Sequence, residues 1–99
     1  MELYLEKWLA TNKVGLEARG AVIENVRAGD IGYACKAVSL DIQYKGHFAR
    51  VMLNCEGRLY AHILVADSYK TVFLFDETVA FNNSEFNGFM TCFIQLLIG

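Results

Sequence analysis

Two short glycine-containing turns divide residues 36–66 into three segments of alternating apolar and other side chains. The turns are Lys45-Gly46 and the three residues that end at Gly57, and each glycine can supply the positive φ that a tight hairpin needs. An alternation with a period of two is typical of β-strands. The segments therefore predict an antiparallel meander with strands at 36–44, 47–54 and 58–66.

The flanking residues give weaker strand signals. Residues 67–70 are predicted to form a turn, and residues 71–76 a fourth strand. Residues 77–81 are expected either to extend this strand or to follow it. Residues 21–27 suit either an edge strand or a short helix, because so few residues do not reveal a period. Residues 28–33 are expected to form a loop. The meander is therefore four-stranded, or five-stranded if 21–27 joins it.

Helices are predicted at both ends of the chain. In residues 1–13, apolar side chains recur on one helical face, and Gly15 and Gly20 are expected to loosen the chain that follows. Near the other end, Asn82 and Glu85 have the spacing of a capping box. Behind this cap, six apolar residues recur three and four apart: Phe86, Phe89, Met90, Phe93, Ile94 and Leu97. The predicted fold is α+β, with an N-terminal helix, the meander, and a C-terminal helix packed on one sheet face, all in a single domain 1–99.

Composition excludes several classes of function. The chain has 99 residues, 9 basic against 11 acidic, and this balance argues against a nucleic-acid-binding protein. The longest apolar run is too short and interrupted to span a membrane, and the start of the chain does not resemble a signal peptide. Three widely spaced cysteines do not suggest a disulfide framework. We therefore expect a soluble cytoplasmic protein, either a monomer or a weak homodimer.

The two sides of the predicted meander differ in an informative way. One side is aliphatic, with Ala49, Val51, Leu53, Leu59, Ala61, Ile63 and Val65. The other side carries Phe48, Arg50, Met52, Arg58, Tyr60 and His62. Aromatic residues, methionine and arginine are enriched at protein interfaces. This second side therefore predicts a surface that binds another protein, and Asp67, Asp76 and Glu77 are candidates for contacting a basic partner.

Two other interpretations of the second side stay open. In the first, the N-terminal helix crosses the sheet and buries these aromatic residues as ordinary core. In the second, a one-residue shift of the strand register exchanges the two sides.

The sequence contains no pattern typical of an enzyme or a cofactor site. His47, Cys55 and His62, even with Cys35 or Cys92, lack the short ligand spacing of zinc motifs. Asp41 and His62 are expected to form a cross-strand ion pair rather than an acid–base dyad, because no motif places a nucleophile beside them. No glycine pattern matches a phosphate-binding loop. We therefore expect no catalytic residue, no metal and no cofactor.

Much of the chain resembles the TriTu group of small bacterial immunity proteins. The matching pieces are Trp8, the "NCEGRL" turn, the "VADSYKTVFLFD" strand pair and the "NNSEF" helix start, whereas "CEG" and "YAHI" stand where more tryptophan and acidic residues are expected. The resemblance implies a protein without catalytic residues that binds and neutralises the C-terminal domain of a cognate toxin, in a polymorphic or contact-dependent toxin system.

Two alternative functions stay open. A small acidic chaperone of secretion, or a dimeric adaptor, would bind an effector segment through a sheet face or a helix. A small enzyme or metalloprotein would instead use the histidine and cysteine positions.

Overall fold

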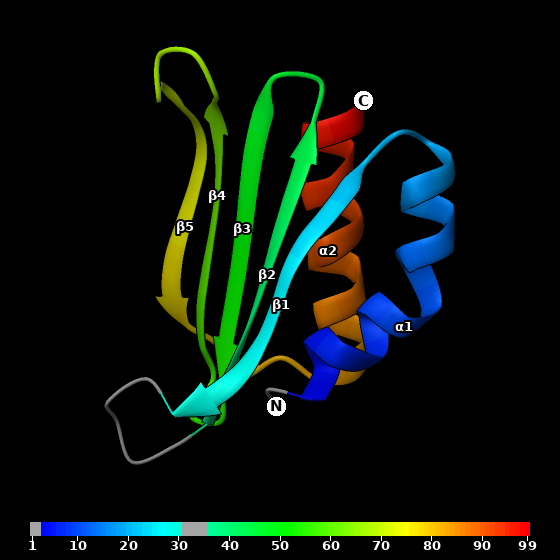
Figure 1. The fold of residues 1–99 in the computed structure, drawn as a ribbon. Coiled ribbons are helices and arrows are strands. Elements are labelled where there is room, and N and C mark those ends of the chain that lie inside the picture. The colour runs from blue at the N-terminus through cyan, green and yellow to red at the C-terminus, as the bar shows by residue number, and fades with distance from the viewer. Residues whose placement is uncertain (1–2, 31–35) are drawn as a thin grey trace.

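A five-stranded sheet and two helices make up the computed structural model, which describes residues 3–30 and 36–99. Their order along the chain is α1 (Leu3–Ala18), β1 (Val22–Asp30), β2 (Lys36–Tyr44), β3 (His47–Asn54), β4 (Arg58–Val65), β5 (Thr71–Thr78) and α2 (Asn83–Ile98). The strands are antiparallel and neighbour one another in sequence order, so the sheet is a simple meander with β1 and β5 at its edges (Figure 1).

The central hairpins follow the sequence closely. The predicted strands 36–44 and 47–54 are confirmed to the residue, and the third ends at Val65, one residue earlier than predicted. Gly46 and Gly57 have φ values of 79° and 86°, which glycine adopts without steric cost. Thr71 begins β5 as predicted, and the strand continues through Thr78.

The first strand is where local sequence was least informative. The structure makes residues 22–30 a strand, so the sheet has five strands and the expected loop at 28–33 is wrong for 28–30; residues 31–33 lie outside the described residues. Gly29 pairs with Ala37 and Asp30 with Lys36. Backbone hydrogen bonds to β2 hold these residues in a strand even though their own β-propensity is low. The local sequence pattern therefore failed to predict the strand.

The first helix is longer than the predicted 1–13 and runs through Gly15 to Ala18. Glycine inside a helix costs about 1 kcal/mol relative to alanine. The added turn buries Leu16 in the core, and this burial offsets the cost. The helix ends where Gly20 adopts a φ of 94° and Ala21 donates a backbone hydrogen bond to Leu16.

The capping box of the second helix is confirmed. The Glu85 backbone N–H donates to the Asn82 side chain at 2.8 Å, and the Asn82 backbone N–H donates to the Glu85 carboxylate at 3.2 Å. These bonds satisfy backbone donors that a helix start otherwise leaves unpaired.

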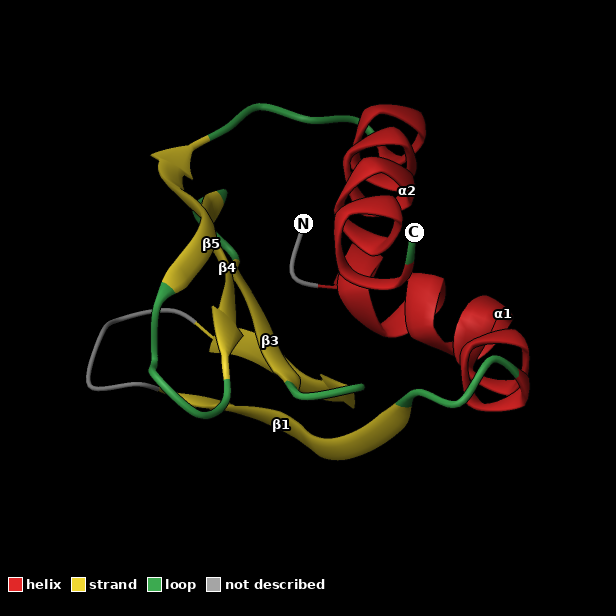
Figure 2. Ribbon diagram, turned by 90° about the horizontal axis from the view of Figure 1, so that it is seen from above, coloured by secondary structure: helices red, strands yellow, loops and turns green. Residues whose placement is uncertain are grey.

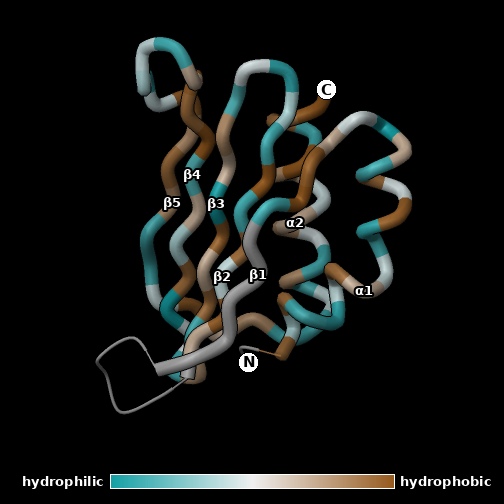
Figure 3. Tube along the Cα trace, in the orientation of Figure 1, coloured by the Kyte–Doolittle hydropathy of each residue, from teal (hydrophilic) through white to brown (hydrophobic). Residues whose placement is uncertain are grey.

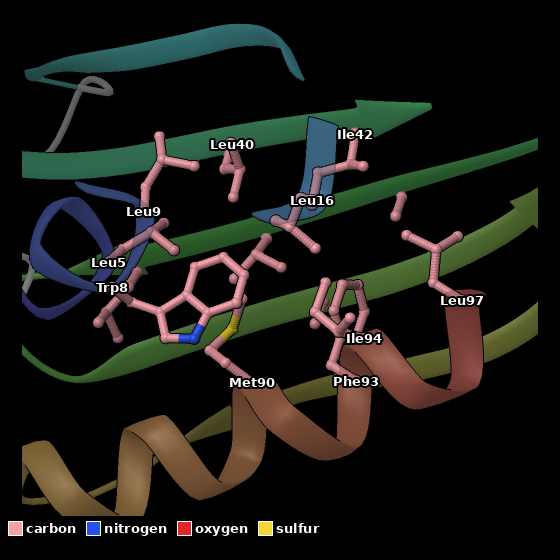
Figure 4. Packing of buried hydrophobic residues seen from close by; sticks show 14 of the residues in the cluster. Leu5, Trp8, Leu9, Leu16, Leu40, Ile42, Met90, Phe93, Ile94 and Leu97 are labelled. Atoms are coloured by element: carbon pink, nitrogen blue, oxygen red, sulfur yellow. The ribbon is translucent and has the colours of Figure 1, made fainter. Parts of the chain in front are cut away.

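Both helices lie on the same side of the sheet (Figure 2). One hydrophobic cluster joins Leu5 and Trp8 of α1 to Met90 and Phe93 of α2 and to the aliphatic residues of the strands (Figure 4). The ring centroids of Phe93 and Phe73 in β5 are 5.8 Å apart. We call this side of the sheet the closed face.

Candidate functional site: the open face of the sheet

The side of the sheet away from both helices is the candidate site, and we call it the open face. Polar residues interrupt the apolar strands in Figure 3, as expected when alternate side chains point to opposite sides. By this alternation the open face comprises Ser39, Asp41, Gln43, Phe48, Arg50, Met52, Arg58, Tyr60, His62, Leu64, Val72, Leu74 and Asp76. None of these thirteen side chains is fully buried, whereas Ala49, Val51, Leu53, Leu59, Ala61 and Ile63 on the closed face all are.

The structure thus supports one of the three interpretations of this surface. The N-terminal helix lies on the closed face, where Trp8 joins the core, and Phe48, Met52 and Tyr60 remain partly exposed. The register assigns the two sides as the sequence predicted, so no one-residue shift exchanges them. All six residues predicted on strands β3 and β4 therefore gather on one surface that neither helix covers.

A row of polar residues crosses the middle of the open face. The register places Asp41, Arg50 and His62 opposite one another on three successive strands, and the apolar Leu74 follows on β5. Arg50 donates two hydrogen bonds to Asp41, from Nε to Oδ1 at 2.7 Å and from Nη2 to Oδ2 at 3.1 Å. Asp41 therefore pairs with arginine, and the expected ion pair with His62 is wrong. The Arg50 side chain keeps 51% of its area exposed, so it remains available to a ligand.

The electrostatics of this row follow from that pairing. The hydrogen bond to Asp41 raises the pKa of Arg50 above its ordinary value. Burial lowers the pKa of His62, the positive charge of Arg50 lowers it further, and Asp41 partly opposes this effect. His62 is therefore neutral at pH 7. Its Nδ1 lies 2.7 Å from Tyr60 Oη, and the two rings meet edge to face.

A second ion pair lies at one end of the open face. Arg58 Nε donates to Asp76 Oδ1 at 2.8 Å across strands β4 and β5. Both arginines predicted for the site are therefore held by a carboxylate from a neighbouring strand. The two pairs make this surface balanced in charge, and the hydrogen bonds to the carboxylates hold both guanidinium groups in place.

Apolar and aromatic residues flank the polar row on both sides. Phe48 pairs with Leu64 on one side, and Met52 pairs with Tyr60 on the other. Toward β5 the apolar character increases, because Leu74 is 60% exposed and Val72 52% exposed. The predicted site omitted Leu64, Val72 and Leu74, although the alternation within 58–66 and 71–76 already placed all three on this side of the sheet. The open face therefore combines apolar area with fixed polar groups, which is the composition of a protein interface.

The three predicted acidic residues do not form one patch. Asp76 belongs to the open face, but Glu77 alternates to the other side of β5. Asp67 lies in the turn after β4, at the opposite end of the sheet. The structure therefore adds Asp76 to the open face and separates Asp67 and Glu77 from it.

The histidine and cysteine positions are also dispersed. Among residues 3–30 and 36–99, no three His, Cys, Asp or Glu side chains come together in a way that would hold a metal. By alternation, His47 and His62 belong to opposite sides of the sheet. Cys92 is a free thiol on α2, whereas Cys55 takes part in a disulfide bond, although the spacing of the cysteines did not suggest a disulfide framework. Cysteine usage therefore does not point to a reducing compartment.

No protein-family model matches this chain, and no curated protein sequence matches it. Within the described parts of the chain, neither helix combines the length and apolar character that a transmembrane segment requires.

Proposed function

We propose that this chain is an immunity protein, which binds and neutralises a bacterial toxin. Its partner is the folded C-terminal toxic domain of that toxin, and it binds this domain through the open face. The observation that carries the proposal is a sheet face left uncovered by both helices, on which Phe48, Met52 and Tyr60 surround the Arg50–Asp41 pair. The helices α1 and α2 lie over the other face.

The chemistry of this surface suits tight binding without catalysis. Aromatic rings and methionine supply contact area at low entropic cost, and an arginine that is already oriented loses little freedom on binding. Neutralising a toxin requires a Kd near or below 1 nM, which corresponds to about −12 kcal/mol. A central cluster of aromatic and arginine anchors is how protein interfaces reach that range.

The experiment is rescue of toxicity. The chain is co-expressed with the C-terminal domain of the toxin encoded beside it, and both survival and co-purification of the two proteins are measured. We expect protection by the natural sequence and loss of protection by the combined variant Phe48→Ser, Met52→Ser and Tyr60→Ser. These side chains are partly exposed, so the variant should keep its fold, which a thermal unfolding measurement checks.

A matched control places the same number of apolar-to-serine changes on the helices. Leu3, Val14 and Leu96 are exposed there, and changing all three to serine should leave protection intact. Absence of both protection and co-purification with the natural sequence would refute the function. Protection that survives the open-face changes but not the helix changes would refute the choice of surface.

A further inference from the structure

Among the described residues, no strand neighbours the outer edge of β5. The Val79 backbone N–H donates to the Gly57 carbonyl at 2.8 Å, so Val79 faces β4. Because successive residues of a strand point their backbone groups to opposite sides, Thr78, Asp76 and Leu74 direct theirs away from β4. Figure 1 shows no other element of the described chain along this edge. Three residues of β5 thus offer backbone donors and acceptors to an additional strand.

This edge lacks most of the features that protect sheet edges from pairing. Such edges usually carry lysine, proline or a bulge in their middle. Residues 71–78 contain neither lysine nor proline, and four successive residues, Val72 to Phe75, are apolar. The one irregularity is a shift of register where Thr71 pairs with Leu64, at the beginning of the strand. The remainder of β5 is therefore free to pair.

We propose that β5 pairs antiparallel with β5 of a second copy of this chain, about a two-fold axis that passes through Leu74. In that register Leu74 exchanges both backbone hydrogen bonds with its own copy, and the two exposed leucine side chains meet on the open face. On the other face, Phe73 lies opposite Phe75 of the second copy. Two such aromatic pairs form, one on each side of the axis.

The charges of the strand select this register. With the axis at Leu74, Asp76 and Glu77 lie opposite Val72 and Thr71 of the second copy, so no two carboxylates face each other. An axis at Asp76 or Glu77 would instead place two carboxylates opposite each other. An axis shifted toward Thr71 would depend on the irregular residues for its hydrogen bonds. Of the residues with outward backbone groups, Leu74 is the one that buries apolar area without opposing like charges.

A dimer built in this way has a defined shape. Its two-fold axis is perpendicular to the sheet, so the two sheets merge into one of ten strands and both open faces point to the same side. The inference uses the edge of the sheet and does not depend on the proposed function.

The first test is the mass of the purified full chain in solution, measured by light scattering and sedimentation over a series of concentrations. We expect the mass to rise from 11.1 kDa to about twice that value. Leu74→Lys should give a monomer at all concentrations, because two ammonium groups would meet at the axis, whereas Leu3→Lys on α1 should dimerise as the natural sequence does. A natural sequence that stays monomeric up to about 1 mM, or a dimer unaffected by Leu74→Lys, would overturn the proposal.

The second test reports the register. In a Cys92→Ser background, Leu74→Cys should form an oxidised cross-link between two copies, because hydrogen-bonded antiparallel partners lie about 5.5 Å apart between Cα atoms. Thr78→Cys is the matched control, since the same register separates Thr78 from its own copy by about 26 Å. Cross-linking through residue 78 but not through residue 74 would overturn the register.

Discussion

The closed and open faces of the sheet are built from alternate residues of the same strands. On β3, Val51 and Leu53 are fully buried, while Arg50 and Met52, which alternate with them, remain in contact with solvent. Both helices cover the first face, and no described element covers the second (Figure 2). The same strand segment therefore supplies the hydrophobic core with one set of side chains and a binding surface with the other.

The difference between the faces shows how a small domain separates stability from recognition. Burial of aliphatic side chains and of the α2 phenylalanines stabilises the fold, and none of that energy depends on a partner. The open face holds its polar groups in pairs at the surface, where ion pairs contribute little to folding. It can therefore be changed extensively without unfolding the chain, and the following predictions test this separation.

The largest predicted effect comes from a matched pair of phenylalanine substitutions, one on each side of the sheet. Phe86→Ala on α2 should lower the free energy of unfolding by about 3–5 kcal/mol, because the ring is fully buried and leaves a cavity. Phe48→Ala on the open face should cost less, about 1–2 kcal/mol, since this ring is partly exposed and leaves no enclosed cavity. Urea titration of both variants measures the difference. Equal losses would mean that the two faces do not differ in their contribution to stability.

A smaller effect is expected at the start of α2, the helix that contributes Phe86 and Phe93 to the closed face. Asn82→Ala removes the acceptor of the Glu85 backbone N–H and should lower the free energy of unfolding by about 1 kcal/mol. Asn82→Asp keeps an acceptor and should restore most of this stability. Both Asn82 variants should bind the partner through the open face as tightly as the natural sequence does. A loss of binding comparable to that of open-face variants would contradict the separation.

The Arg50–Asp41 pair should contribute still less to folding. A double-mutant cycle with Arg50→Ala and Asp41→Ala should give a coupling energy of about 0.5–1 kcal/mol, the upper part of the range for exposed pairs, because the geometry is bidentate. Added salt should reduce the coupling. A coupling energy of several kcal/mol that does not change with salt would mean that this pair contributes strongly to the stability of the fold.

The smallest predicted effect is a dependence of stability on pH at His62. Its pKa in the folded chain is lowered, so the unfolded chain binds a proton more readily, and the free energy of unfolding falls as the pH drops below the ordinary histidine value of about 6.5. His62→Gln should remove this component, whereas His47→Gln should retain it. Thermal unfolding between pH 8 and pH 5 measures the effect. A natural sequence and a His62→Gln variant with identical pH profiles would refute the effect of burial and of Arg50 on His62.

Much of the fold follows from local sequence. The positive φ at Gly46 and Gly57, the period of two between them, and the spacing of Asn82 and Glu85 are each satisfied by residues close together in the chain. These signals predicted the central strands, the α2 cap and the membership of six residues in the open face. The first strand lacked such signals, because its conformation comes from the ladder of β2.

Contacts between segments far apart in the sequence decided the rest. The alternation defined two sides of the sheet but did not determine on which side α1 would lie, since that depends on where Trp8 finds apolar neighbours from α2 and the strands. Nor did it determine that Asp41 would pair with Arg50 on the next strand rather than with His62, or that Cys55 would be in a disulfide bond. The sequence alone determined which side chains share a face, because that follows from backbone geometry. Only the tertiary structure decided which face remained uncovered, because covering one requires the packing of helices from both ends of the chain.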